Sequence, residues 1–154
     1  MKLDLLTNAT VVKDAMRFGS EHSNKKEEIR YFFNSGSGKS IVAWYNRGLS
    51  LSNLGKYEEA IKSYDKVLEI DPDSLYVCNS KGSALNYLGK YEEAVKSYDR
   101  ALEIDPNIIV AWYNRGLSLS NLGKYEEAIK SYDKVLEIDP CNTNAADQIL
   151  SMCL

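Results

Sequence analysis

The chain has 154 residues, of which 44% are hydrophobic and 27% are charged, proportions typical of a globular domain with an apolar core. Its formal net charge of −3 argues against nucleic-acid binding, which needs a strongly basic surface. No apolar run approaches the roughly 18 residues of a membrane-spanning helix, and the odd, irregularly spaced set of Cys78, Cys141 and Cys153 is typical of a reducing cytoplasm.

Residues 1–40 are predicted to form an N-terminal segment that contains two short helices. One helix is expected over residues 9–18. A second opens near Asn24 and Glu27, which resemble a capping box, and is expected to run to about Phe33. This second stretch loosely echoes the second helix of the repeat described below. It is either a degenerate half-repeat that seals the first hairpin or a chance similarity, and the sequence leaves both interpretations open.

The end of this segment, residues 34–40, is rich in serine and glycine and is predicted to be a flexible linker. It contains Gly38-Lys39-Ser40, which resembles the end of a phosphate-binding loop. That motif needs an earlier glycine where this chain has Phe33, and a strand before it. We therefore expect no nucleotide site here, and no other cofactor.

From residue 41 onward the sequence repeats every 34 residues, which divides it into repeats 41–74, 75–108 and 109–142. The first and third repeats are identical as far as their prolines, and the middle one is a diverged copy. The positions that recur in all three are Gly48, Gly82 and Gly116; Gly55, Gly89 and Gly123; Tyr57, Tyr91 and Tyr125; Ala60, Ala94 and Ala128; Tyr64, Tyr98 and Tyr132; Pro72, Pro106 and Pro140.

Each repeat is predicted to be a helical hairpin, as the first one shows. Gly48 is small and would let the two helices approach closely, and Gly55 would supply the left-handed residue that ends the first helix. Tyr57 opens the second helix. Pro72 ends it, because a proline cannot continue a helix and pushes the preceding Asp71 out of the helical region.

These residues resemble the signature of the tetratricopeptide repeat: Trp, Gly, Tyr, Ala, an aromatic residue and Pro at the family's offsets. The resemblance implies an all-α, helical-hairpin solenoid with a right-handed superhelical stack. It also implies a protein–protein interaction module or scaffold. Two departures stand out, namely basic residues where the family usually has an apolar one, and a cysteine where the flanking repeats have tryptophan. The residues concerned are Arg47, Lys81 and Arg115, and Cys78 against Trp44 and Trp112.

Residues 143–154 align with the start of a fourth repeat but lack its tryptophan and glycine. They are predicted to form a C-terminal capping helix, which repeat arrays need at their ends. Its expected apolar stripe consists of Ala145, Ala146, Ile149, Leu150 and Cys153.

The candidate binding residues follow from the resemblance, because in this family the first helices of successive hairpins line a concave groove. The groove-facing residues would be Tyr45, Leu49, Ser52 and Asn53; Asn79, Ser83, Asn86 and Tyr87; and Tyr113, Leu117, Ser120 and Asn121. Tyrosine, asparagine and serine suit an extended peptide or a helix from another protein. The alternative is that some of these residues only solvate the helices or contact the neighbouring hairpin.

The family's best-known binding mode grips the C-terminal carboxylate of a peptide with lysines and arginines of the groove. Tyr45 occupies the position that usually supplies the first lysine, and Asn46 and Asn114 are present without the lysines. We therefore do not expect this chain to clamp chaperone tails. The three basic residues of the repeats would either form a basic ladder or extend along the seam between hairpins.

Catalysis is not expected from this sequence. His22 is the only histidine, and the cysteines lack the spacing of zinc ligands, so no metal site is predicted. The repeated carboxylates lie beside lysines at helical spacing, which is typical of surface ion pairs. No pairing of a nucleophile with a base emerges, and we predict that the chain is not an enzyme.

Self-association is a second hypothesis. Because the first and third repeats are identical, the faces that stack within one chain would also be able to stack between chains. Such a contact joins two different surfaces and gives rings, swapped dimers or open filaments. The N-terminal segment would then regulate which ends are free.

Overall fold

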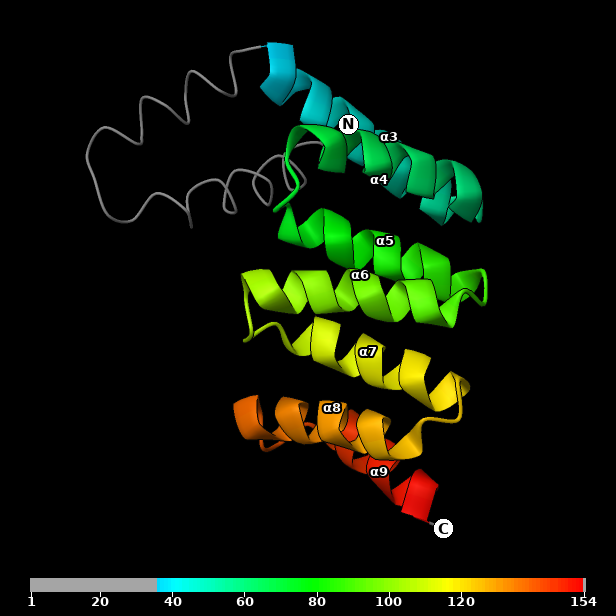
Figure 1. The fold of residues 1–154 in the computed structure, drawn as a ribbon, viewed down its shortest axis with the longest axis vertical. Coiled ribbons are helices and arrows are strands. Elements are labelled where there is room, and N and C mark those ends of the chain that lie inside the picture. Colours follow the sequence, from blue (N-terminus) through cyan, green and yellow to red (C-terminus); the bar gives the residue numbers. More distant parts are fainter. Residues whose placement is uncertain (1–35, 154) are drawn as a thin grey trace, which may run out of the picture. The chain divides into compact units, whose positions relative to one another are not determined.

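The computed structural model describes residues 36–153, and within that range it contains seven α-helices and no strand (Figure 1). The predicted helices over 9–18 and 24–33 lie outside the described residues. None of the described helices is both long enough and apolar enough to cross a membrane. The helices are α3 (Gly36–Asn53), α4 (Tyr57–Ile70), α5 (Leu75–Tyr87), α6 (Tyr91–Ile104), α7 (Ile109–Asn121), α8 (Tyr125–Ile138) and α9 (Thr143–Cys153).

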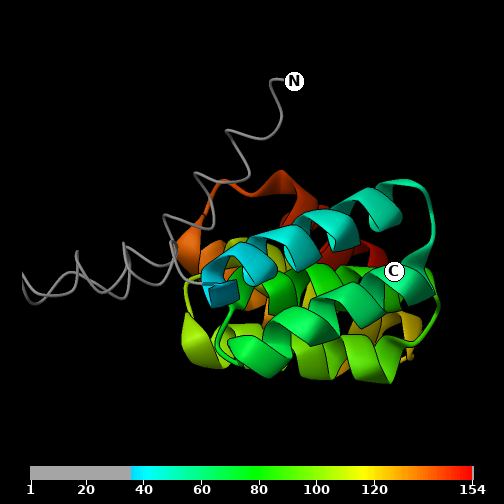
Figure 2. The same ribbon diagram turned by 90° about the horizontal axis from the view of Figure 1, so that it is seen from above.

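The chain divides into two compact units, residues 1–74 and residues 75–154. The described part of the first unit is the hairpin of α3 and α4, which lie antiparallel and are joined by a short turn (Figure 2). The second unit contains the hairpin of α5 and α6, the hairpin of α7 and α8, and α9. The all-α fold of helical hairpins is confirmed, while the right-handed superhelix stays a prediction.

The turn inside each hairpin has a backbone geometry that favours glycine. Gly55, Gly89 and Gly123 have φ angles of 73°, 72° and 73°, in the left-handed region that residues with a side chain rarely adopt. In the first hairpin the N–H groups of Gly55 and Lys56 donate to the carbonyls of Ser52 and Leu51, at 3.0 and 2.9 Å. These bonds satisfy carbonyls of the last helical turn, so the predicted helix stop is confirmed.

The second helix of the hairpin ends two residues before its proline. In the first repeat α4 ends at Ile70, and Asp71 has an extended backbone with φ −133° and ψ 92°. The Asp71 N–H still donates to the carbonyl of Val67 at 2.8 Å, and Pro72 then leaves the helix. The prediction that proline excludes the preceding residue from the helix is confirmed.

The predicted linker is wrong over Gly36–Ser40, because these residues form the start of α3. The Ser40 hydroxyl donates to the carbonyl of Gly36 at 2.8 Å, one helical turn earlier. Gly38 is buried, so packing offsets the weak helix propensity of glycine. Gly38, Lys39 and Ser40 therefore lie in a helix, whereas a phosphate-binding loop places its glycines in an irregular loop.

The core of each hairpin is a tyrosine of the second helix packed on a glycine of the first. Tyr64, Tyr98 and Tyr132 are among the largest fully buried side chains. A Cβ atom placed on Gly82 would lie 2.6 Å from Cε1 of Tyr98, closer than real Cβ atoms come. The glycine is therefore needed for the tyrosine ring to reach the backbone of the first helix, as its small size had indicated.

The predicted capping helix is α9, which packs on α8. Ala145 is fully buried in a cluster with residues of α7 and α8, and Ile149 and Met152 are partly buried against it. The predicted stripe is wrong at Leu150 and Cys153, which are exposed. Leu150 stands at the position of the repeat glycine, and in the earlier hairpins the neighbour of that position is the following second helix. No described helix follows α9, so nothing described covers Leu150.

Candidate protein-binding face

In the first unit, two of the four predicted residues of α3 take part in packing their own hairpin. Tyr45 is only 7% exposed, and its ring lies 6.2 Å from that of Tyr64, centre to centre, at 46°. The Ser52 hydroxyl is 3.1 Å from the Tyr64 hydroxyl. Leu49 is half-buried and Asn53 is exposed. Most of Tyr45 is therefore out of reach of a partner, although the role of these four residues in binding stays a prediction.

On α5 the predicted residues are more accessible. Asn79, Ser83 and Asn86 are half-buried, and Tyr87 is 73% exposed. Ser83 accepts a hydrogen bond of 3.3 Å from the Tyr98 hydroxyl. Burial raises the pKa of Tyr98 to about 12, although the hydrogen bond with Ser83 acts in the opposite direction. The Oδ1 atom of Asn79 is buried and has no hydrogen-bond partner among the described residues.

On α7 the predicted residues surround a buried tyrosine. Tyr113 is half-buried, and its ring lies 5.6 Å from that of Tyr132, at 60°. Burial raises the pKa of Tyr132, and the hydroxyl of this residue has no hydrogen-bond partner in the described part of the chain. Leu117 and Ser120 are half-buried, and the exposed Asn121 donates from its Nδ2 to the carbonyl of Leu117 at 3.0 Å.

A side-chain hydrogen bond joins the two first helices of the second unit. The hydroxyl of Ser118, on α7, is 3.0 Å from Oδ1 of Asn86, on α5, and 3.0 Å from the carbonyl of Asn114. The two helices contact each other. Asn86 therefore contacts the neighbouring hairpin, which is the alternative that the sequence left open at this position. The first three predicted residues of each helix share one face, because they are separated by four and three positions, and the fourth residue adjoins the third.

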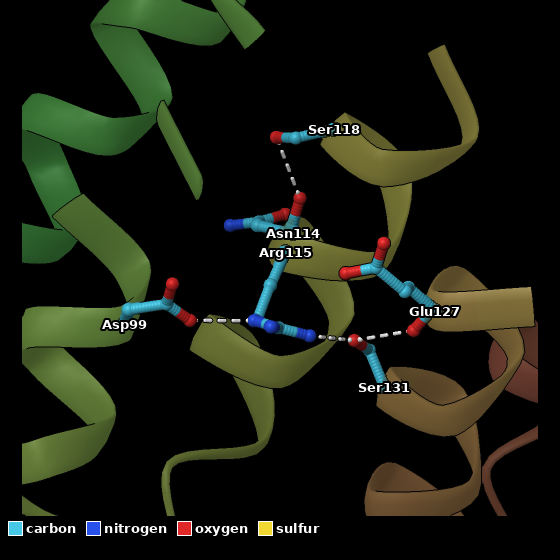
Figure 3. Close-up of polar contacts among 6 residues, drawn as sticks. All are labelled: Asp99, Asn114, Arg115, Ser118, Glu127 and Ser131. Atoms are coloured by element: carbon cyan, nitrogen blue, oxygen red, sulfur yellow. Dashed lines mark hydrogen bonds and ion pairs between the residues drawn. The ribbon is translucent and has the colours of Figure 1, made fainter. Parts of the chain in front are cut away.

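Arg115 lies in the seam between hairpins and contacts residues of both neighbouring hairpin helices, α6 and α8 (Figure 3). Its Nε is 2.6 Å from Oδ1 of Asp99 on α6, and its Nη1 donates to the hydroxyl of Ser131 on α8 at 2.7 Å. The guanidinium also lies 5.8 Å from the ring centre of Trp112. Of the two predictions for the basic residues, extension along the seam is confirmed for Arg115.

The residues that hold these arginines were not singled out from the sequence. Ser131 is fully buried and donates to the carbonyl of Glu127 at 3.1 Å while it accepts from Arg115. Arg47 of the first unit makes the same contact with Ser63, at 2.5 Å. The recurrence of an arginine and a serine sixteen positions apart was the available signal, since these positions face each other across a hairpin.

Within residues 36–153, no group of three or more His, Cys, Asp or Glu side chains is arranged to hold a metal ion. His22 lies outside the described residues. The candidate site is therefore the face of α5 and α7 that carries the predicted residues, and its role in binding stays a prediction.

The sequence matches known families over its repeats. Residues 41–74 and 109–140 match the Tetratricopeptide repeat, and residues 82–123 match the TPR repeat. Comparison with curated proteins gave no match.

Several solved structures are similar to this chain. The first TPR of Spaghetti (RPAP3) bound to the HSP90 peptide SRMEEVD is 29% identical, with a TM-score of 0.71 over 75% of this chain and 91% of that chain. The second TPR domain of human RPAP3, in complex with the HSP70 peptide SGPTIEEVD, is 28% identical, with a TM-score of 0.73 over 77% and 99%. MamA shares the fold at 21% identity, with a TM-score of 0.69 over 83% and 81%.

Proposed function

Because the chain belongs to the tetratricopeptide repeat family, we propose that it is a non-catalytic interaction module that binds a peptide segment of another protein. The binding surface in this proposal is the face of α5 and α7 in the second unit. Two similar structures hold chaperone peptides, which supports a peptide as the type of ligand.

The observation that carries the proposal is the composition and exposure of this face. Tyr87 exposes most of its ring, and Tyr113 exposes part of its ring while Tyr132 supports it from below. Aromatic side chains of this kind provide contact area at a low cost in conformational entropy.

The charge of the face bears on the kind of peptide. The peptides in the two similar structures end in Glu-Glu-Val-Asp. The twelve candidate residues of this chain include no lysine, arginine or histidine, and Arg115 is held in the seam by Asp99 and Ser131. We propose that the ligand is an uncharged or mixed polar segment that the first helices bind by aromatic contact and by amide hydrogen bonds.

A peptide-display selection on the immobilised full chain tests the proposal, followed by fluorescence anisotropy with the enriched peptides. Tyr87→Ala is expected to weaken binding by about tenfold or more, since exposed aromatic residues often dominate such interfaces. The peptide SRMEEVD serves as the acidic comparison, and we expect it to bind more weakly than the selected peptides.

Tyr125→Ala is the matched control, because Tyr125 is a 54% exposed tyrosine at the start of α8, on the second helix of its hairpin. It is expected to leave binding unchanged. Equal losses for the two variants, or a selection that enriches no peptide, would contradict the proposal. Tyr45→Ala is less suitable, because this ring is buried and its loss would disturb packing.

We also propose a cytoplasmic location, since the three cysteines are unpaired and a reducing compartment keeps thiols free. Fractionation of native cells with detection of the full chain tests this. Recovery in an oxidising compartment would contradict it.

A further inference from the structure

Two helices of identical sequence differ in what covers one of their faces. From Ile41 to Asn53, α3 has the same residues as α7 from Ile109 to Asn121. One face of each helix, extended into the turn that follows it, is formed by four positions at helical spacing, with intervals of four, three and four. The open face of α3 consists of Ala43, Arg47, Ser50 and Leu54, which are all exposed. The same positions on α7 are Ala111 and Ser118, which are buried, and Arg115 and Leu122, which are half-buried.

The structure shows what covers this face on α7. It is the preceding hairpin, whose second helix, α6, contacts α7. Arg115 reaches Asp99 of α6, and Ser118 reaches Asn86 of α5 (Figure 3 shows the arginine). The open face of α3 therefore has the side chains to receive a second helix that carries an aspartate at the position of Asp99. Arg47 has no carboxylate partner among the described residues, although it contacts Ser63 and the ring of Trp44.

The C-terminal hairpin presents such a helix. Asp133 of α8 stands at the position of Asp99, is exposed, and contacts no cation among the described residues. The helix that covers α8 is α9, in which Ile149 stands where the repeats have their basic residue. Ala145 is the one buried residue of α9, whereas α7 buries four of its residues. A helix of 11 residues depends on packing for its stability, and α9 buries few side chains. It is therefore the helix of this unit that separates from its neighbour most easily.

We propose that the open face of α3 binds α8 of a second copy of this chain, and that α9 of that copy moves away from α8 so that α3 can bind there. Arg47 then pairs with Asp133 of the second copy, as Arg115 pairs with Asp99 within one chain. The contact joins two different surfaces, so it repeats from copy to copy unless the assembly closes. Neither Arg47 nor Asp133 is among the residues proposed to bind a peptide.

Sedimentation velocity of the full chain over a wide range of concentration tests the proposal. The wild type is expected to associate in a concentration-dependent manner. Arg47→Asp and Asp133→Arg, each alone, are expected to weaken association by about tenfold or more, because like charges then meet at the junction. An equimolar mixture of the two variants is expected to associate again, since opposite charges then face each other at every junction between unlike chains.

Two further variants make the result decisive. Lys130→Asp reverses an exposed charge elsewhere on α8 and is expected to leave association unchanged. Ala145→Asp places a charge between α9 and α8 and is expected to strengthen association by freeing α8. Circular dichroism checks that each variant keeps its helices. A monomer at every concentration for both the wild type and Ala145→Asp would overturn the proposal, and would leave residues 1–35 as the occupant to consider. Failure of the mixture to associate would overturn it as well.

Discussion

The ring of Tyr132 lies directly against the backbone of Gly116, so that a Cβ atom on Gly116 would be 2.7 Å from both Cε1 and Cζ of the tyrosine. The same contact recurs in each hairpin, and Tyr132 has no exposed surface. The ring cannot move aside without opening the hairpin, because it is packed on all sides.

Gly116→Ala is therefore expected to destabilise the protein. Overpacking costs roughly 1–3 kcal/mol, which outweighs the gain of about 1 kcal/mol from replacing a helical glycine by alanine. Urea unfolding followed by circular dichroism measures the change. Gly36→Ala is the matched control, because Gly36 lies in α3 and no atom of a neighbouring described residue lies within 4 Å of its added Cβ. It is expected to be neutral or slightly stabilising, and an equal loss for both variants would contradict the explanation.

The Arg115–Asp99 pair is expected to couple two hairpins more strongly than a surface pair does. Its side chains are 20% and 45% exposed, against 48% and 65% for Arg100 and Glu103 within α6. A double-mutant cycle to alanine should give about 1–2 kcal/mol for the first pair, because it is less exposed to solvent, and less than about 0.5 kcal/mol for the second. Similar coupling energies for the two pairs would contradict this prediction, because the position between hairpins would then not strengthen the Arg115–Asp99 pair.

The identical serines Ser52 and Ser120 are expected to differ in their contribution to stability. Ser52 is within hydrogen-bond distance of the Tyr64 hydroxyl, whereas the Tyr132 hydroxyl has no partner among the described residues. Ser52→Ala should therefore cost about 1 kcal/mol, and Ser120→Ala less. Thermal unfolding of the two variants makes the comparison, and a larger loss for Ser120→Ala would refute it.

Stability is expected to fall at high pH through the buried tyrosines. Tyr98 has an ordinary pKa of 10.0, which burial raises to about 12 in the folded chain. The unfolded chain therefore loses this proton first, so the stabilisation is fully present below pH 10 and is lost as the pH rises towards 12. Each pKa unit corresponds to about 1.4 kcal/mol.

Urea unfolding at several alkaline pH values measures this loss, with Tyr98→Phe as the comparison. The variant lacks the ionisable hydroxyl, so its stability should decline less steeply between pH 10 and pH 12. Tyr125→Phe is the control, because this ring is exposed and should not change the slope. Parallel curves for Tyr98→Phe and the wild type would contradict the assignment.

The hairpins were predictable because their signals are local. Gly55 tolerates the positive φ angle that the turn needs, and Pro72 cannot continue a helix, so both signals act locally. The start of α3 was not predictable on this basis, because a glycine- and serine-rich stretch has weak helix propensity. Packing around the buried Gly38 made it helical.

The candidate binding face was predictable only as a set of positions. The sequence places Tyr45 and Tyr113 in the same local context, yet Tyr45 is buried and Tyr113 is half-buried. It places Asn86 on the predicted face, yet this side chain accepts a hydrogen bond from the next hairpin. Which of these residues a partner could reach depends on the neighbours of each hairpin, and the pattern of a single repeat does not contain that information.

The sequence by itself therefore determined the hairpins of the repeats, their turns and the glycine–tyrosine contact inside each hairpin, because all of these arise within one repeat. The tertiary structure alone decided what each repeat exposes. Ser118 is fully buried and Ser50 is exposed, although both lie in the same stretch of identical sequence. The physical reason is that a side chain is buried only where a second surface covers it. A hairpin packs on this face of α7, whereas α3 presents the same residues to solvent.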